Sequence, residues 1–332
     1  GRRGHNRGVG VFQAATGVGA AAGPLVGGPL VLFWGWPAVF WFRVPICVAL
    51  LVLARSIGPT TQRTRASSDV AGAVLVTLGL TAGLLAVNSG RTFGFASPLV
   101  AIATVVTVAV GAIYVARART HPAPILDPSL FSVRRFSIAN LLTVLANGAM
   151  FVAWLLVPAM LVTELGRPAV VSGIALAASP IAMGAFAPLA GRWSDRSGYR
   201  APIATGLVLE AIGLAWLATA SPGTSTVAVT LAMATTGAGL GLFGVPNMAM
   251  VMSTLPHTEQ GAAGGLSLVM RTAGIVIGVS GSAALFDHLQ QTVGFFDAYR
   301  STTLTSAAVA AIAAALAMAD GLARSPARPA VA

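Results

Sequence analysis

The chain has 332 residues, of which 56% are hydrophobic and only 9% are charged, and its mean hydropathy is +0.82. Soluble domains carry about 25% charged residues, so this composition excludes a soluble globular protein, and the high hydrophobicity excludes an intrinsically disordered one. The net charge of +11 comes from arginine, since the chain contains no lysine. The composition therefore indicates an integral membrane protein.

Ten apolar segments follow one another along the chain, each about as long as a membrane-crossing helix requires. They cover approximately residues 9–33, 38–54, 70–88, 97–116, 138–162, 169–190, 202–220, 225–252, 261–285 and 302–319. None shows the alternation of apolar and polar residues that is typical of a membrane β-barrel strand. The sequence therefore predicts an all-α polytopic membrane protein with about ten transmembrane helices.

The first segment contains small residues at regular spacing. Gly19, Gly23 and Gly27 recur every four residues, with Gly28 next to the last of them. On a helix they share one face, which lets a neighbouring backbone approach closely, and Pro24 favours a bend. The pattern predicts a bent helix with a flat glycine face, and ordinary small-residue packing is the alternative.

The longest connection between segments runs from 117 to 137. Its prolines prevent one continuous helix, and its mixture of apolar and basic residues suits a segment that lies along the membrane interface. It separates four predicted spans from the six that follow.

The arginines are distributed unequally between the two sides of the predicted membrane. Ten spans place both termini on one side, and the loops of that side carry 15 of the 20 arginines. The opposite loops carry 3, which are Arg91, Arg167 and Arg300, while Arg43 and Arg271 lie inside spans. The positive-inside rule then predicts that both termini are cytoplasmic. Because the arginines mark topology and form no patch, nucleic acid is not expected as a partner.

A charged loop is predicted between the sixth and seventh segments. The chain there reads Gly191-Arg192-Trp193-Ser194-Asp195-Arg196-Ser197-Gly198-Tyr199-Arg200. Gly198 permits a tight turn, and Asp195 can bond to the first amides of the next helix or pair with Arg196 or Arg200. The loop is predicted to act as a cytoplasmic gate that forms and breaks as the helices move, and an ordinary turn rich in arginine is the alternative.

Two ionisable residues lie near the middle of predicted spans, where a charge costs about 2.5–3.5 kcal/mol. Glu210 lies roughly 12 Å into the seventh segment and Arg271 roughly 15 Å into the ninth, at about 1.5 Å per residue. This similar depth would allow the two side chains to interact. Glu210 is a candidate proton-coupling carboxylate, and Arg271 and Asn147 are candidates for coupling or substrate binding; structural contacts inside the bundle are the alternative for each. Asp69, at the start of the third segment, is predicted to cap that helix.

Motifs of enzyme chemistry are missing from the sequence. It contains no HExxH, GxSxG or Walker motif, and its four histidines have no partner at metal-ligand spacing. Neither an enzyme activity nor a metal or other cofactor is expected.

Several of these stretches resemble motifs of one transporter superfamily. The glycine-rich stretch of the first segment resembles the antiporter signature, motif C, in helix five of major facilitator superfamily exporters, and residues 191–200 resemble the superfamily's loop motif A. Residues 35–45 are similar to the start of helix six, although Pro37-Ala38 and Arg43 replace the usual Arg-Trp and Asn. Residues 124–136 resemble the link before helix nine in the fourteen-helix branch. The order of these motifs resembles the drug:proton antiporter family of the EmrB/QacA type.

The resemblance implies a domain organisation. The ten segments would be helices five to fourteen of such a protein, truncated at its N-terminus. Residues 1–54 would end the N-terminal bundle with two spans, 55–116 would form two linker spans, and 117–137 a cytoplasmic interfacial loop. Residues 138–320 would form the C-terminal six-helix bundle, and 321–332 a cytoplasmic tail. By the same template, Glu210 lies on an outer helix and Arg271 on an inner one.

The resemblance also implies a function. It predicts a secondary active transporter in the cell membrane that exports small amphipathic or cationic compounds by alternating access. Its partners would be the lipid bilayer, a small-molecule substrate and protons, with the proton gradient as driving force in place of a cofactor and a monomer as the working unit. The alternatives are an exporter of an endogenous metabolite and a transport-incompetent fragment that lacks the first four helices.

Overall fold

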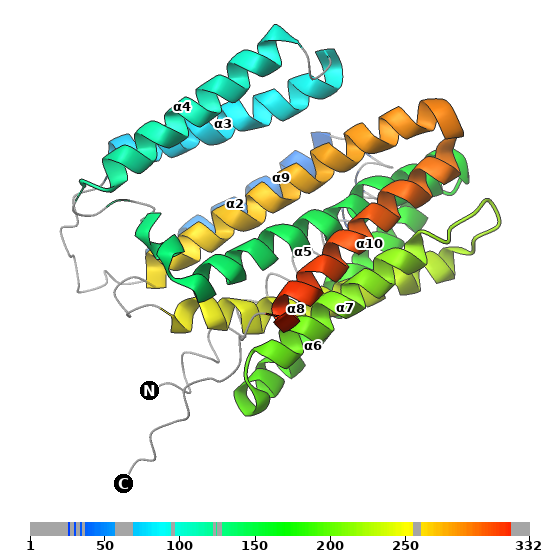
Figure 1. Cartoon of the computed structure of the whole chain (residues 1–332). Coiled ribbons are helices and arrows are strands. Elements are labelled where there is room, and N and C mark those ends of the chain that lie inside the picture. The colour runs from blue at the N-terminus through cyan, green and yellow to red at the C-terminus, as the bar shows by residue number, and fades with distance from the viewer. Residues whose placement is uncertain are drawn as a thin grey trace.

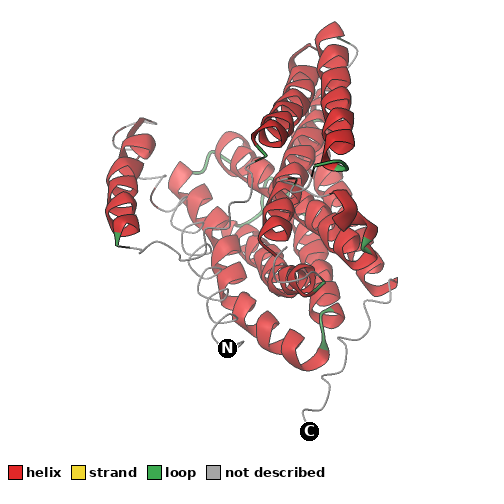
Figure 2. Ribbon diagram, turned by 90° about the vertical axis from the view of Figure 1, so that its left-hand side faces the viewer, coloured by secondary structure: helices red, strands yellow, loops and turns green. Residues whose placement is uncertain are grey.

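The computed structural model describes residues 37–56, 69–93, 97–121, 128–254 and 260–319, together with the single positions 26, 30, 34 and 124. All regular structure in these described ranges is helical (Figure 2), which confirms the predicted all-α class. The glycine stretch of the first segment falls outside the described residues, and so does the predicted tail 321–332. The motif residues that therefore lie outside the described ranges are Gly19, Gly23, Pro24, Gly27 and Gly28.

The described helices follow the predicted order. They are α2 (Pro37–Arg55), α3 (Val70–Phe93), α4 (Pro98–Ala118), the 3-10 turn η1 (Pro128–Ser132), α5 (Arg134–Pro158) with its π-helical continuation η2 (Ala159–Glu164), α6 (Ala169–Ser197), α7 (Arg200–Leu217), α8 (Thr226–Ser253), α9 (Gln260–Val293) and α10 (Phe295–Ala319). Within the described ranges, the seven helices from α4 to α10 are long and apolar enough to cross a membrane, whereas α3 has a shorter apolar part, Val70–Ala86.

Helices α6, α9 and α10 extend furthest beyond their predicted apolar segments. α6 continues to Ser197, α9 continues to Val293, and α10 begins at Phe295. Hydropathy marks only the part of a helix that suits the membrane interior, whereas backbone hydrogen bonding continues through polar residues until the chain is interrupted. The interruptions are Gly198 and Gly294, whose φ angles of 82° and 84° lie in the left-handed region that ends a helix.

Helices α3 and α4 form an antiparallel hairpin that stands apart from the six helices α5–α10 in Figure 1, with α3 in contact with α9. At its base, the Asp69 carboxylate oxygen Oδ1 accepts a hydrogen bond from the Gly72 amide at 2.8 Å, which confirms the predicted cap. The same oxygen accepts a bond from Arg117 Nη2 at 2.8 Å. One buried carboxylate therefore joins the start of α3 to the end of α4.

Replacing Asp69 with asparagine is expected to weaken the base of this hairpin, because the amide can still cap α3 but no longer carries the charge that attracts Arg117. The hydrogen bond from Arg117 holds the pKa of Asp69 below its ordinary value. A carboxylate of this kind stabilises the folded state above its ordinary pKa of about 4, and the contribution is lost as the pH falls through the lowered pKa. Thermal unfolding of the purified protein as a function of pH measures this loss.

The control for this measurement is Asp195→Asn, which removes an exposed carboxylate without an ion pair in the described part of the chain. The Asp69 variant should have a lower Tm at neutral pH and a smaller loss of Tm on acidification than the wild type. Identical profiles of Tm against pH for the wild type and the Asp69 variant would show that the ion pair between Asp69 and Arg117 does not stabilise the hairpin.

Helix α8 packs most closely against α6 and α7. Gly237 and Gly241 face α6, where a Cβ at Gly237 would overlap the carbonyl oxygen of Ser179. Gly239 faces α7, where a Cβ would overlap the amide nitrogen of Glu210. The glycines of α8 therefore bring two neighbouring helices to backbone contact on different sides.

A second close interface joins α5 and α9. A Cβ at Gly274 would overlap the carbonyl oxygen of Val144, and a Cβ at Gly278 would overlap that of Gly148. Because the paired positions increase together along both helices, α5 and α9 run parallel. Helix α10 packs against α5, α7 and α9 and so joins the two halves of the bundle.

Candidate functional site

Three polar side chains lie on one buried face of α5. Asn140, Thr143 and Asn147 are spaced three and four residues apart, so they share a helix face, and each is at most 9% exposed. Each donates a hydrogen bond to the carbonyl oxygen four residues earlier in α5. Their side-chain oxygens therefore remain free to accept bonds from other helices, and we call these three residues the α5 polar face.

Two neighbouring helices use these acceptors. From α9, Ser267 Oγ donates to the Asn140 side-chain oxygen at 3.0 Å, and Arg271 Nε donates to the Asn147 side-chain oxygen at 3.2 Å. From α8, Asn247 Nδ2 donates to Thr143 Oγ1 at 2.8 Å and to the Ala139 carbonyl at 3.1 Å. Polar contacts therefore join α5, α8 and α9 in the interior of the bundle.

The structure brings two of the predicted residues together and separates the third. Arg271 pairs with Asn147 across the α5–α9 interface. Glu210 and Arg271 form no hydrogen bond or ion pair in the described residues, because α7 packs mainly against α8 and α10 while α9 packs mainly against α5 and α10. Similar depth in the membrane places two residues at one level without making their helices neighbours.

Glu210 is enclosed where α7 meets α8. Its side chain is fully buried, and neither carboxylate oxygen has a hydrogen-bond partner in the described part of the chain. Gly206 and Gly213 flank it on the same face of α7, and a Cβ at Gly206 would lie 2.6 Å from the Gly239 carbonyl oxygen of α8. Helix α8 contains no charged residue, so Glu210 faces that helix without a counter-ion.

The predicted cytoplasmic loop is shorter than expected. Helix α6 continues through Gly191, Asp195 and Arg196 to Ser197, and only the turn at Gly198 separates it from α7. The positive φ of Gly198 confirms the predicted tight turn.

The polar contacts of this turn also differ from the predicted ones. Asp195 lies exposed in the last turn of α6 and forms no ion pair with Arg196 or Arg200 in the described part of the chain. Because α6 does not end at Asp195, the carboxylate is not placed at the start of α7. Arg200 donates instead to the carbonyl oxygen of Met318, near the end of α10, where a positive charge complements the helix dipole. The gating role of these residues stays a prediction.

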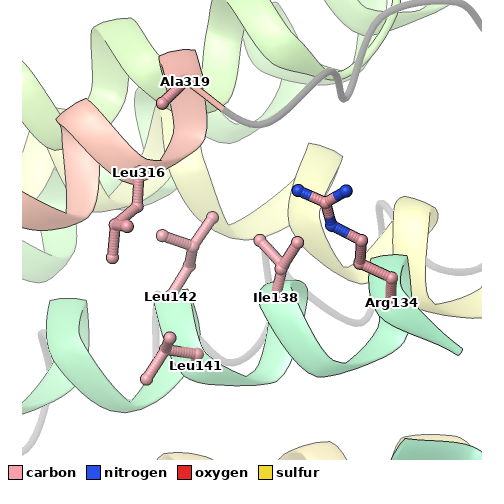
Figure 3. Close-up of a pocket in the computed structure, with 6 residues that line it drawn as sticks. All are labelled: Arg134, Ile138, Leu141, Leu142, Leu316 and Ala319. Carbon is pink, nitrogen blue, oxygen red and sulfur yellow. The ribbon is translucent and has the colours of Figure 1, made fainter. Parts of the chain in front are cut away.

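A small pocket of about 200 Å³ opens between the start of α5 and the end of α10 (Figure 3). In Figure 3, Ile138 and Leu142 point from α5 toward α10, and Leu316 points back from α10. The complete lining is Arg134, Ile138, Leu141, Leu142, Leu316 and Ala319. The lining is apolar apart from one arginine, and it includes no member of the α5 polar face.

Three residues of the polar cluster were not predicted: Thr143, Ser267 and Asn247. Serine and threonine occur throughout membrane helices, where they bond to their own backbone, so neither stands out in a sequence. Asn247 lies in a long apolar segment. Its side-chain amide is predictable as a candidate for the same reason as that of Asn147, because polar side chains are rare in such segments.

Comparison with known proteins places this bundle in a family. Residues 139–330, more than half of the chain, match the family model described as the Major Facilitator Superfamily. The chain belongs to this superfamily. Its seven membrane-length helices within the described ranges and its membership of this superfamily identify a multi-pass membrane protein.

Three relatives illustrate the similarity of this superfamily member to curated proteins. The uncharacterised transporter YebQ of Escherichia coli (strain K12) is 31% identical over 93% of the chain and 66% of its own length. The multidrug resistance protein Stp of Mycobacterium tuberculosis (strain ATCC 25618 / H37Rv) is 29% identical over 86% of the chain and 55% of its length. The multidrug export protein EmrB of Escherichia coli (strain K12) is 30% identical over 79% of the chain and 52% of its length. The chain thus spans between about half and two thirds of these relatives.

Proposed function

We propose that the protein is a secondary active transporter of the fourteen-helix drug:proton antiporter type, which exports small amphipathic compounds by alternating access. The names of Stp and EmrB, a multidrug resistance protein and a multidrug export protein, support export of such compounds. The hairpin α3–α4 before the six-helix bundle agrees with the two linker spans of that type. Two helical bundles that rock against each other around a central site are the general mechanism of such transporters.

The observation that carries the coupling part of the proposal is the enclosure of Glu210. An ionised carboxylate is costly to bury without a cation or donors to hydrogen-bond it. Glu210 has neither in the described residues, and it lies where α7 and α8 meet through glycines. If these helices shift during transport, the same carboxyl group can meet water and exchange its proton, which is what coupling to a proton gradient requires.

The orientation and location form part of the same proposal. The excess of arginine in alternate loops favours cytoplasmic termini, and proton-driven export favours the cell membrane. The proton gradient would be the driving force without a further cofactor, and the working unit would be a monomer.

Transport by inside-out membrane vesicles tests this function. Vesicles from cells that express the protein should accumulate an amphipathic dye, tested separately as a cation (ethidium) and as an anion (fluorescein), when respiration acidifies their interior. A protonophore should abolish the accumulation, and vesicles from cells without the gene provide the background. Accumulation of neither dye above background, or accumulation that persists with the protonophore, would contradict proton-coupled export.

A further inference from the structure

Arg271, which is half-buried at the α5–α9 interface, presents unused hydrogen-bond donors. Its Nε donates to the Asn147 side-chain oxygen at 3.2 Å. Its Nη1 and Nη2 nitrogens form no hydrogen bond or ion pair within the described ranges. A guanidinium has five N–H donors in a planar fork and cannot lose its charge in a protein, so most of its binding capacity remains available.

Two features orient this guanidinium. Gly274 and Gly278 hold α9 against the α5 backbone directly after Arg271. The Asn147 amide donates to the Thr143 carbonyl at 2.9 Å, which turns its oxygen toward Arg271. One nitrogen of Arg271 is therefore used for orientation, while the other two form the end of the fork that suits a carboxylate, sulfonate or phosphate.

No carboxylate of the described chain neutralises this charge. Glu210 lies on α7, which packs mainly against α8 and α10. Asp287, on α9 itself, is 16 residues further along, roughly 24 Å at about 1.5 Å per residue. Because an unpaired charge is costly inside a membrane bundle and tends to mark a substrate or ion pathway, the missing anion is expected to come from a ligand.

A second unsatisfied group lies beside the same face of α5. Asn247 uses its side-chain nitrogen for Thr143 and Ala139, but its side-chain oxygen is buried and has no partner in the described structure. Buried polar atoms of native proteins nearly always have a partner. A hydroxyl or N–H group on a bound compound would supply the donor that this oxygen lacks.

We propose that Arg271 binds the anionic group of the transported compound, with Asn147 as its positioning residue. The substrate class is then an amphipathic organic anion. This inference rests on the proposed function for transport, but it concerns binding, which can be measured separately.

Equilibrium binding of two dyes tests the proposal. Fluorescein, an organic anion, and ethidium, a cation, are titrated with the purified protein in lipid nanodiscs and followed by fluorescence anisotropy. Arg271→Gln should weaken fluorescein binding by about tenfold or more, as expected for the loss of hydrogen bonds to a charged group. Arg271→Lys should retain part of the affinity, and ethidium binding should not weaken in either variant.

The matched control is Arg43→Gln. Arg43 is the other arginine in a predicted span, but it is exposed, with its guanidinium carbon 5.9 Å from the centre of the Phe40 ring. This variant should bind fluorescein like the wild type. An equal loss in the Arg43 and Arg271 variants would show a general attraction by positive charge and would overturn the proposal.

Asn147→Asp provides a second variant in case Arg271→Gln does not fold. The introduced carboxylate pairs with Arg271 in place of the ligand, so fluorescein binding should fall although Arg271 is still present. Unchanged fluorescein affinity in both the Arg271→Gln and the Asn147→Asp proteins would overturn the proposal, and so would a wild type that does not bind fluorescein.

The binding measurement and the vesicle assay fail independently. Binding that depends on Arg271, in a protein that shows no protonophore-sensitive export, would contradict the proposed function and leave the anion site intact. Proton-coupled export of ethidium by a protein that does not bind fluorescein would support the function and overturn the anion site.

Discussion

Replacing Gly237 with alanine is expected to destabilise the bundle more than any other single methyl group added to α8. The new Cβ would overlap the Ser179 carbonyl oxygen of α6, and backbone atoms cannot rotate away as the end of a side chain can. Overpacking of a close interface costs about 1–3 kcal/mol and sometimes more. We expect a loss at the upper end of this range, or failure of α6 and α8 to pack at all.

Gly244→Ala is the matched control on the same helix, because a Cβ at Gly244 would meet no atom within 4 Å. Thermal unfolding in detergent, followed by size-exclusion chromatography, compares the two variants, with roughly 2–4 °C of Tm expected per kcal/mol for 150–250 residues. Equal Tm values for the two alanine variants would show that α6 and α8 do not pack through Gly237.

Glu210→Gln is expected to reduce proton-coupled export to background while leaving the protein folded. Glutamine has nearly the size and shape of a protonated glutamic acid, so it fits the same enclosed space between α7 and α8, but it cannot release a proton. Its thermal stability should therefore match or exceed that of the wild type, because the uncharged amide removes the cost of burying a carboxylate without partners.

The control for Glu210 is Glu164→Gln, since Glu164 is exposed at the end of η2. Both variants are assayed for dye accumulation in inside-out vesicles with and without a protonophore. Export at the wild-type rate by the Glu210 variant would exclude Glu210 from coupling, even if the protein were stabilised. A loss in the Glu164 variant as well would point to a general effect of removing acidic groups.

Much of the fold could be predicted because membrane burial leaves a strong and local signal. Long apolar segments must be helical, since a helix satisfies its own backbone hydrogen bonds in lipid. The seven described helices that are long and apolar enough to cross a membrane lie where hydropathy placed them. The cap at Asp69 and the turn at Gly198 were predictable for a similar reason. Each depends on atoms only a few residues apart in the chain.

The candidate site was predictable only in part. Asn147 and Arg271 are predictable as candidates because polar residues are rare in apolar segments, and the structure pairs them. Asn247, which joins the same cluster, is an equally rare amide in an apolar segment, whereas Ser267 is a weaker signal because serine is common in membrane helices. The loop motif correctly marked a turn, but the length of α6 depends on backbone hydrogen bonds that continue beyond the apolar segment.

From the sequence alone, the class of the protein, its helical segments and the depth of each polar residue in the membrane could be determined. Depth is a coordinate along one helix, and it contains no information about which helices are neighbours or how each is rotated. Those two quantities are set by packing, here by the glycines of α8 and α9 that admit a second backbone. Only the tertiary structure could therefore decide that Arg271 faces Asn147, that Glu210 is enclosed against α8, and that Arg200 bonds to the end of α10.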